Sequence, residues 1–221
     1  REIRDRQGEA NSLINLGISY CSFGEYDLAI RSHKESLVIC GKIKDRRGEA
    51  VSLGRLGIAY KSMGKYKRAI TYHEMSLAIK LEIKDREGEG NSLGNLGDAY
   101  FYLGEYERAI TYYEKSLAIC GEIRDRRGEA NSLGSLGISY RSLGEYKLAI
   151  ACHEKSLTIC REIKDRQGEA VSLGSLGNAY LFLGDYKRAI AYYAKSLAIC
   201  LEIKYPIGEV ASLNKLGNAY R

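Results

Sequence analysis

Apolar and small residues recur along the chain with helical spacing, and the whole pattern returns every 40 residues. The motif G-E-x-x-S-L-x-x-L-G-x-x-Y occurs six times, and its first glycine lies at positions 8, 48, 88, 128, 168 and 208. A second motif, G-[EDK]-Y-x-x-A-I-x-x-x-x-x-S-L-x-I, follows the first one five times. Self-similarity at a fixed period is typical of repeat proteins. The chain therefore contains five full repeats and the first half of a sixth.

Each motif has the spacing of one amphipathic helix. In the third copy, the first motif places these residues on one helical face: Leu93, Leu96, Gly97, Tyr100 and Leu103. The second motif does the same with Tyr106, Ala109, Ile110, Tyr113, Leu117, Cys120 and Ile123. We expect first helices near 46–63 and second helices near 66–84, repeated every 40 residues, and a single first helix near 206–220. No segment alternates with the period of two that a strand would show, so the pattern predicts an all-α fold.

Polar residues and glycines mark the expected helix ends. An aspartate that can serve as N-cap precedes the first helix in five copies, as Asp5, Asp45, Asp85, Asp125 and Asp165. In the sixth copy Tyr205 replaces the aspartate, and the only proline, Pro206, follows at N1, where a missing N–H costs nothing. A glycine that can adopt the left-handed backbone ends each first helix, as Gly24, Gly64, Gly104, Gly144 and Gly184.

A single helix pair of this size cannot bury its apolar face, so neighbouring pairs must stack into one continuous core. We therefore expect one α-solenoid of antiparallel helix pairs over residues 1–221. Its repeats span residues 6–44, 46–84, 86–124, 126–164 and 166–204, and a half repeat spans 206–221.

The motifs L-G-x-x-Y, G-[DE]-Y-x-x-A-I and S-L-x-I resemble the tetratricopeptide repeat. Leucine stands where that family usually has an aromatic residue early in the first helix, and serine stands for the alanine late in the second. The extra residues with D-R-x-G-E-[AG] are similar to the forty-residue variety in LGN/Pins-type scaffolds, kinesin light chains and long bacterial and invertebrate arrays. The resemblance implies a right-handed superhelix whose concave groove, lined by first helices, binds peptide or protein segments.

Composition narrows the possible functions. Of the 221 residues, 45% are hydrophobic and 28% are charged, and no apolar run approaches the roughly 18 residues of a membrane span. The mean hydropathy is -0.31, and we expect neither a membrane partner nor a targeting segment. The net charge of +6 comes from interspersed charges without a basic block, which disfavours nucleic-acid binding.

The cysteines and histidines follow the repeat rather than a chemical motif. Four of the six cysteines share one repeat position, as Cys40, Cys120, Cys160 and Cys200, and Lys80 holds it in the second copy. An intervening helix separates equivalent positions of neighbouring repeats, and helices pack about 8–10 Å apart. The Cα atoms of two such cysteines therefore lie beyond the roughly 7 Å limit for a disulfide. With no C-x-x-C motif, we expect free thiols in a reducing, intracellular (cytoplasmic) compartment.

The three histidines share one position on the second helix, as His33, His73 and His153, and Tyr113 and Tyr193 fill it elsewhere. This exchange suits a partly buried aromatic site with a polar tip. Gly88-Glu89-Gly90 lacks the Lys-Ser/Thr of a phosphate loop. With no recurring ligand set and no nucleophile–base pair, we expect no catalytic residues, no metal site, no cofactor and no enzymatic activity.

A stripe of positions on the first helix changes between copies, and the resemblance places this stripe in the groove. Its candidate peptide-binding residues are Asn91, Asn95, Asp98, Phe101, Tyr102, Asn131, Arg141, Asn178, Leu181 and Phe182. The asparagines can bond a peptide backbone, although a merely solvated face stays an alternative. Mid-helix glycines at 54, 94, 134 and 174 suggest close approach of either a ligand or the neighbouring helix.

Within this stripe we expect repeats 3 to 5 to dominate binding. Phe101, Tyr102, Leu181 and Phe182 would receive apolar side chains, unless they pack at the turns of their own repeats. The arginines that LGN-type proteins have in the groove early in the first helix are replaced here by other residues. This weakens the expectation that the groove prefers acidic peptides. The basic groove candidates that remain are Arg55, Lys61, Arg141 and Lys215.

The sequence thus predicts a non-enzymatic scaffold that binds peptide or protein segments in a concave groove. The alternative is a structural or self-assembling array, a spacer without a specific groove ligand. The last helix, with Leu213, Leu216 and Tyr220, lacks a covering second helix, so we also expect end-to-end self-association through 206–221.

Overall fold

The computed structural model describes the chain from Glu2 to Ala219, with side chains from Asp5 onward. Tyr220, which completes the last motif, and Arg221, which ends the expected half repeat, lie outside the described residues. The same is true of Arg1.

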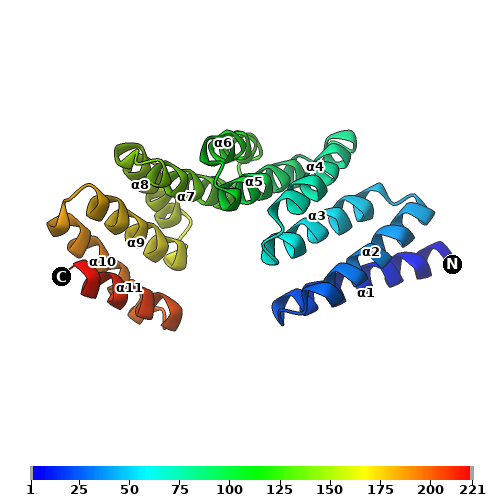
Figure 1. The fold of residues 1–221 in the computed structure, drawn as a ribbon, viewed down its shortest axis with the longest axis horizontal. Coiled ribbons are helices and arrows are strands. Elements are labelled where there is room, and N and C mark those ends of the chain that lie inside the picture. Colours follow the sequence, from blue (N-terminus) through cyan, green and yellow to red (C-terminus); the bar gives the residue numbers. More distant parts are fainter. Residues whose placement is uncertain (1, 220–221) are drawn as a thin grey trace. The chain divides into compact units, whose positions relative to one another are not determined.

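Eleven helices and no strand make up the described part of the chain (Figure 1). The first helices of the repeats are α1 (Glu2–Ser22), α3 (Arg46–Ser62), α5 (Arg86–Leu103), α7 (Arg126–Ser142), α9 (Arg166–Phe182) and α11 (Pro206–Ala219). The second helices are α2 (Tyr26–Ile43), α4 (Tyr66–Glu82), α6 (Tyr106–Ile123), α8 (Tyr146–Glu162) and α10 (Tyr186–Glu202). This order confirms the predicted all-α array of helix pairs. Within the part that is described, no helix combines the length and apolar character that crossing a membrane requires.

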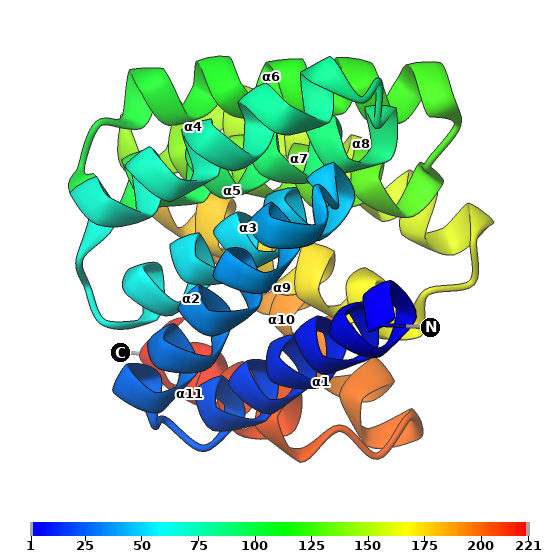
Figure 2. The same ribbon diagram turned by 90° about the vertical axis from the view of Figure 1, so that its right-hand side faces the viewer.

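The chain forms two compact units, residues 1–119 and residues 120–221. In the first unit α1 packs on α2, α2 on α3, α3 on α4 and α4 on α5, and the first helices α1, α3 and α5 also contact one another in turn. In the second unit α7 to α11 pack in the same consecutive way, and α9 contacts both α7 and α11. Figure 2 shows the same pairs after a turn of 90°. In each unit the first helices thus form a layer of their own.

Aspartate side chains cap four first helices as predicted. In each case the carboxylate accepts a hydrogen bond of 2.9 Å from the N–H three residues later, for example from Gly48 to Asp45. Pro206 begins α11 as predicted. The prediction for Asp5 was wrong, because α1 already begins at Glu2 and Asp5 lies inside the helix. In the other copies, the residue before the aspartate has a left-handed backbone that ends the preceding helix. The residues before Asp5 are helical instead.

The turns within and between repeats use different residues for the same backbone conformation. The predicted glycines, Gly24, Gly64, Gly104, Gly144 and Gly184, all have a positive φ. Between repeats the left-handed residue is Lys or Arg, as Lys44, Lys84, Arg124, Lys164 and Lys204. The next N–H closes this turn, as from Asp45 to the Cys40 carbonyl at 2.9 Å. A long basic side chain at a left-handed position gives no local sequence signal, so these turns were not predicted.

The core of each repeat rests on a glycine that faces an aromatic ring. A Cβ added at Gly57 would lie 2.5 Å from the His73 ring, and one added at Gly97 would lie 2.6 Å from the Tyr113 ring. The glycine of L-G-x-x-Y therefore exists because the second helix presses an aromatic side chain against the first-helix backbone. The histidines are fully buried, which is deeper than the partly buried site that the sequence predicts.

Buried serines tie the two helices of each repeat together. Ser76 donates to the Ala50 carbonyl at 2.7 Å, and the equivalent serines of the other four repeats make the same bond at 2.8–3.0 Å. Some of them also bond the next repeat, as Ser36 does to Ser52 at 3.0 Å. Each serine therefore satisfies a buried carbonyl with its hydroxyl, which explains why it stands where the family has alanine.

Candidate functional site

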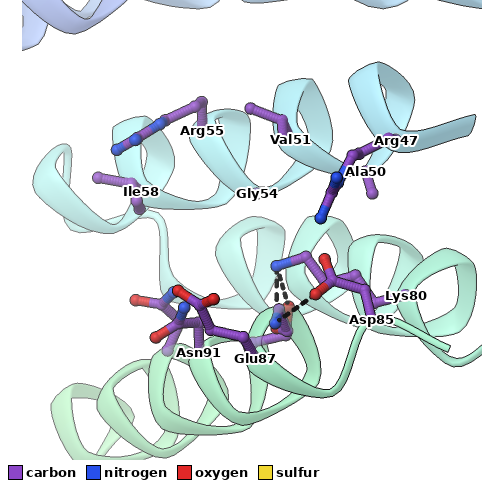
Figure 3. Close-up of a pocket in the computed structure, with 13 residues that line it drawn as sticks. Arg47, Ala50, Val51, Gly54, Arg55, Ile58, Lys80, Asp85, Glu87 and Asn91 are labelled. Atoms are coloured by element: carbon purple, nitrogen blue, oxygen red, sulfur yellow. Dashed lines mark hydrogen bonds between the residues drawn. The ribbon is translucent and has the colours of Figure 1, made fainter. Parts of the chain in front are cut away.

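A pocket of about 370 Å³ opens between α3 and α5 in the first unit. Both walls come from first helices, and the second helix α4 contributes Lys80 to the floor (Figure 3). The lining residues are Arg47, Ala50, Val51, Gly54, Arg55, Ile58, Lys80, Asp85, Glu87, Gly88, Asn91, Ser92 and Asn95. The pocket thus lies on the variable stripe and joins two neighbouring repeats.

Two of the mid-helix glycines, Gly54 and Gly134, have space beside them, whereas a Cβ at Gly174 would lie 3.1 Å from the Lys215 ammonium. A Cβ at Gly54 would meet nothing closer than the Ser76 hydroxyl at 3.4 Å, and one at Gly134 would meet the Ser156 hydroxyl at 4.0 Å. Both are ordinary van der Waals distances, so neighbouring helices do not require glycine there. Of the two explanations for these glycines, tight helix packing is therefore contradicted at Gly54 and Gly134. Their missing side chains instead widen the pockets.

Lys80 gives the first pocket an unusual floor. Its ammonium donates to the Gly88 carbonyl at 3.0 Å and to the Ser92 hydroxyl at 2.9 Å (Figure 3). Burial lowers the pKa of Lys80, and the nearby Arg55 charge lowers this pKa further, while Asp85 acts in the opposite direction. Asp85 itself caps α5 through the N–H of Gly88. The pocket lining therefore includes a half-buried ammonium, that of Lys80, and the guanidinium of Arg55.

A second pocket of about 280 Å³ occupies the equivalent place between α7 and α9 in the second unit. It is lined by Ala130, Asn131, Gly134, Ser135, Ile138, His153, Ser156, Cys160, Gly168, Val171, Ser172 and Ser175. The position of Lys80 is held here by Cys160, and that of Arg55 by Ser135. No charged side chain that the structure describes lines this pocket. The same repeat thus builds one charged and one neutral pocket.

Three predicted asparagines line these pockets. Asn91 and Asn95 line the first pocket, and Asn131 lines the second. Asn91 and Asn131 are exposed and Asn95 is half-buried. None of the three amides bonds to another side chain or backbone group within the described range, so all remain available to a ligand.

Asp98 and Asn178 already bond other side chains of the array, Asp98 in its own and the preceding repeat and Asn178 in its own. Asp98 accepts a hydrogen bond of 2.8 Å from the Tyr113 hydroxyl and forms an ion pair with Lys61 at 2.6 Å. Asn178 accepts a hydrogen bond of 2.9 Å from the Tyr193 hydroxyl. Both side chains therefore satisfy a tyrosine of the second helix.

The aromatic residues predicted near Asp98 lie at the C-terminal end of α5, away from the pocket. Phe101 contacts Tyr106 of its own repeat, with ring centroids 5.3 Å apart. Tyr102 stacks on Tyr66 of the preceding repeat at 5.7 Å and is 57% exposed. The predicted alternative, packing at the turn of the same repeat, thus describes Phe101, and Tyr102 bridges two repeats.

The second unit repeats this arrangement at the end of α9. Phe182 stacks on Tyr146 of the preceding repeat at 5.8 Å, and the Arg141 guanidinium lies 5.3 Å from the Phe182 ring centroid. Leu181 is half-buried and packs against the core that contains Tyr193. Arg141 therefore stacks on one aromatic residue and does not lie in the second pocket.

Two sequence signals could have revealed more. Copies with histidine on the second helix have isoleucine at the facing position, as Ile18, Ile58 and Ile138, and copies with tyrosine have Asp98 or Asn178 there. The polar residue accompanies tyrosine because its side chain accepts a hydrogen bond from the tyrosine hydroxyl. The second signal is Lys80, which alone breaks the cysteine pattern and proves to be the floor of the first pocket.

Five of the six ring nitrogens of the buried histidines are buried without a hydrogen-bond partner. Both ring nitrogens of His33 and His73 and the Nε2 atom of His153 are buried and unbonded. Burial is the main cause that lowers the pKa of each histidine to about 4, and nearby basic side chains add to it. These rings are therefore neutral at pH 7 and serve as core residues.

The cysteines also serve packing. All six are free, and the Cys40 sulfur lies 2.6 Å from where a Cβ of Gly48 would be. Burial raises the pKa of the Cys40 and Cys160 thiols. Over the described residues, no group of three or more His, Cys, Asp and Glu side chains is placed to hold a metal ion.

Comparison with known families agrees with the repeat. The family model described as Tetratricopeptide repeat matches residues 8–82, 77–122, 88–162 and 128–202, which together cover most of the chain. The chain belongs to the tetratricopeptide-repeat family. No curated protein matches this tetratricopeptide-repeat chain.

Solved structures share the tetratricopeptide-repeat fold at low sequence identity. BtubC (BKLC) from P. vanneervenii is 19% identical with a TM-score of 0.77, and the match covers 93% of this chain and 92% of BtubC. Aspartyl phosphate phosphatase F from Bacillus subtilis is 17% identical with a TM-score of 0.85, covering 94% of this chain and 55% of that protein. A Rap protein complexed with Competence and Sporulation Factor is 14% identical with a TM-score of 0.71, covering 100% of this chain and 65% of that protein.

Proposed function

We propose that the chain is a non-enzymatic interaction scaffold that binds peptide or protein segments along its first helices, with the two pockets as its main contact sites. Asn91, Asn95 and Asn131 would bond the backbone of the bound segment. In this proposal the aromatic residues at the ends of α5 and α9, with Arg141, form an outer rim of contacts.

The open glycines are the observation that carries the proposal. Glycine inside a helix costs about 1 kcal/mol against alanine. Gly54 and Gly134 have room for a Cβ, so packing does not account for that cost. A surface that must let an extended chain approach the helix backbone does account for it. The unbonded amides beside these glycines can donate to and accept from a peptide group.

Related folds support the same class of function. Tetratricopeptide-repeat proteins commonly act as protein-interaction scaffolds, and one Rap protein with this fold was solved in complex with Competence and Sporulation Factor. We extend only the class of partner, a peptide or protein segment, to this chain. The six free cysteines fit our further proposal of a reducing, intracellular location.

A library of random twelve-residue peptides displayed on phage tests the proposal on the full chain. We expect enriched peptides whose binding is lost in the variants Gly54→Leu and Gly134→Leu, because the leucine side chain would fill the pocket. Ala78→Leu is the matched control, since Ala78 is exposed on the second helix α4. Binding that survives both pocket variants, with unchanged helicity, would contradict the proposal.

A self-assembling array stays as the alternative, and an exposed apolar face on α11 favours it. Ile207, Val210 and Leu213 are exposed on this helix, and Leu213 is 55% exposed. Contiguous exposed apolar residues promote association. If the array were only a spacer, the peptide library would yield no enrichment on the wild-type chain, while the chain would still self-associate.

A further inference from the structure

An apolar groove runs between α1 and α2, at one end of the first unit (Figure 1). Its volume is about 350 Å³, and its accessible lining is almost entirely apolar. The lining residues are Glu9, Leu13, Lys34, Glu35, Val38 and Ile39. None of them lines either of the two pockets between first helices. The groove is therefore a separate feature of the surface.

Leucines around this groove are exposed, although their equivalents in repeats 2 to 5 are buried. Leu16 is 44% exposed, whereas the leucines at its position in those repeats are 0–3% exposed. Leu13 and Ile39 are half-buried, and their equivalents are buried. Because α1 packs on its own second helix as α3 does, the difference lies on the other side of α1. There the later repeats have a preceding second helix, and no described helix covers α1.

Within the chain, a leucine of the preceding second helix occupies the equivalent place. Leu157 of α8 is buried in one apolar cluster with Leu173 and Ile199 of the following repeat. The equivalent leucine of α2 packs on the second repeat in the same way. Leu13 and Ile39, which line the groove, hold the positions of Leu173 and Ile199 in the first repeat. The groove thus has the lining that receives a leucine at internal boundaries.

A pair of serines accompanies this leucine at three internal boundaries. Ser156, the residue before Leu157, bonds Ser172 of the next repeat at 3.2 Å, and the equivalent pairs at two other boundaries measure 3.0 and 3.1 Å. Ser12 holds the position of Ser172, is exposed, and donates to the Gly8 carbonyl at 2.9 Å. A hydroxyl also has two acceptor lone pairs. Ser12 can therefore accept a hydrogen bond from an incoming serine.

We propose that Ser12, Leu13, Leu16 and Ile39 form an N-terminal face that docks an amphipathic helix of a partner protein, with a leucine of that helix in the groove and the preceding serine against Ser12. The helix would add one second helix to the array. Continuity with the internal boundaries carries the inference, because they bury a Ser-Leu pair against the same positions. Terminal repeats of soluble arrays typically carry a polar outer face, which this face lacks. The inference does not depend on a ligand in the first-helix pockets.

A synthetic peptide with the sequence of α8, residues 146–162, is the probe, because it carries the Ser156-Leu157 pair. Fluorescence anisotropy of the labelled peptide, titrated with the full-length chain under reducing conditions, measures its affinity. We expect saturable binding that is at least about tenfold weaker for the Leu157→Ala peptide, because the leucine is the anchor. The Thr158→Ala peptide is the matched control and should bind unchanged, since Thr158 is exposed on α8.

The two ends of the array supply matched variants of the chain. Leu13 and Leu213 hold the same repeat position, and no described second helix covers α11 either. Leu13→Glu should abolish binding of the peptide, because it places a charge in the groove, and Leu213→Glu should leave binding unchanged. Circular dichroism checks the helicity of both variants. The Leu157→Ala peptide tests the same contact on the unaltered chain, so the test does not depend on the folding of Leu13→Glu.

Four results would overturn the proposal. They are no binding of the α8 peptide, equal binding of its Leu157→Ala form, binding that Leu213→Glu abolishes while Leu13→Glu does not, and self-association that Leu13→Glu removes. The last result, measured by sedimentation velocity, would assign the N-terminal face to a second copy of this chain. None of the four bears on the pocket variants Gly54→Leu and Gly134→Leu, so the docking face and the scaffold proposal fail separately.

Discussion

The two first-helix pockets are built from the same repeat, yet they offer a ligand different chemistry. Ala50, Gly54, Ile58, Gly88 and Ser92 of the first pocket have identical counterparts 80 residues later. The differences lie in side chains at the rim and floor. Two cations of the first pocket become serine and cysteine in the second, while the backbone that holds them keeps its pattern of glycines and serines.

Val51 and Asn91 show the same principle in a reciprocal form. In the second pocket Asn131 stands at the place of Val51, and Val171 stands at the place of Asn91. Each pocket thus has valine at one of these two positions and asparagine at the other, on opposite walls. The comparison teaches that the shared residues specify the scaffold, whereas a few positions change the chemistry of the pocket lining while the repeat stays the same.

The largest expected effect concerns the buried histidines, which both units contain. The pKa of His33, His73 and His153 is about 4 in the folded chain, below the ordinary value of 6.5. Between these values the unfolded chain binds more protons, so the free energy of unfolding falls as pH falls from 6.5 toward 4. Each histidine should cost about 3 kcal/mol when fully protonated. Urea unfolding at pH 7.5, 5.5 and 4.5 measures this loss, and a flat profile would contradict the buried, neutral assignment.

A double variant sharpens this test. His153→Tyr with Ile138→Asn reproduces the Tyr193–Asn178 pair of the next repeat, which does not titrate in this range. We expect less loss of stability between pH 6.5 and 4.5 than in the wild type, and similar stability at pH 7.5. Hydrogen bonding by Arg46 lowers the pKa of Glu82 below its ordinary 4.5, and this contribution is the same in both chains, so it cancels in the comparison.

The next effect separates two glycines on α3. Gly57→Ala should lower the free energy of unfolding by about 1–3 kcal/mol, because the new Cβ would overlap the His73 ring. Gly54→Ala, three residues earlier, should raise it by up to about 1 kcal/mol, since the Cβ has room and alanine favours the helix. Thermal and urea unfolding of both variants measure the difference. Equal destabilisation by both would mean that the pocket is closed by packing.

A smaller effect follows from placing the two cations of the first pocket at the equivalent positions of the second. Ser135→Arg with Cys160→Lys places the two cations of the first pocket in the second. We expect an acidic peptide to bind this variant about tenfold more tightly than the wild type when the first pocket is blocked by Gly54→Leu, which corresponds to about 1.4 kcal/mol. Isothermal titration calorimetry gives the affinities. Unchanged affinity would show that the cations do not select the ligand.

The smallest effect concerns the exposed face of α11. Leu213→Glu should reduce self-association of the chain at high concentration, because a charge interrupts the exposed apolar residues. Sedimentation velocity over a range of concentrations measures it. Strictly monomeric behaviour of the wild type would remove the end-to-end alternative.

Most of the fold could be predicted because each repeat contains its own helix signals. Asp45 marks the start of the first helix α3 and Gly64 marks its end, and the structure confirms both. The prediction for Asp5 failed because residues 2–4 before it are helical, so Asp5 lies inside α1 and not at its start. The left-handed Lys44 could not be foreseen because lysine carries no preference for that backbone.

The candidate site was only partly predictable. The position of Asn91 on the first helix was sufficient to place it beside a neighbouring repeat, and it does line a pocket. The contacts of Tyr102 and Phe182 depend on how far one repeat is shifted past the preceding one, and helical spacing does not contain that information. Lys80 was visible as an exception, but its pocket required the packing of α3, α4 and α5.

The most direct test of the peptide-binding account is amide NMR of the full-length chain with one selected peptide and its scrambled version. We expect shifts at the backbone amides of Gly54, Gly88 and Gly134, which line the two pockets, and no shifts with the scrambled peptide. Shifts confined to α11 or to the turn at Gly104, or no shifts at all, would contradict a binding site in the first-helix pockets.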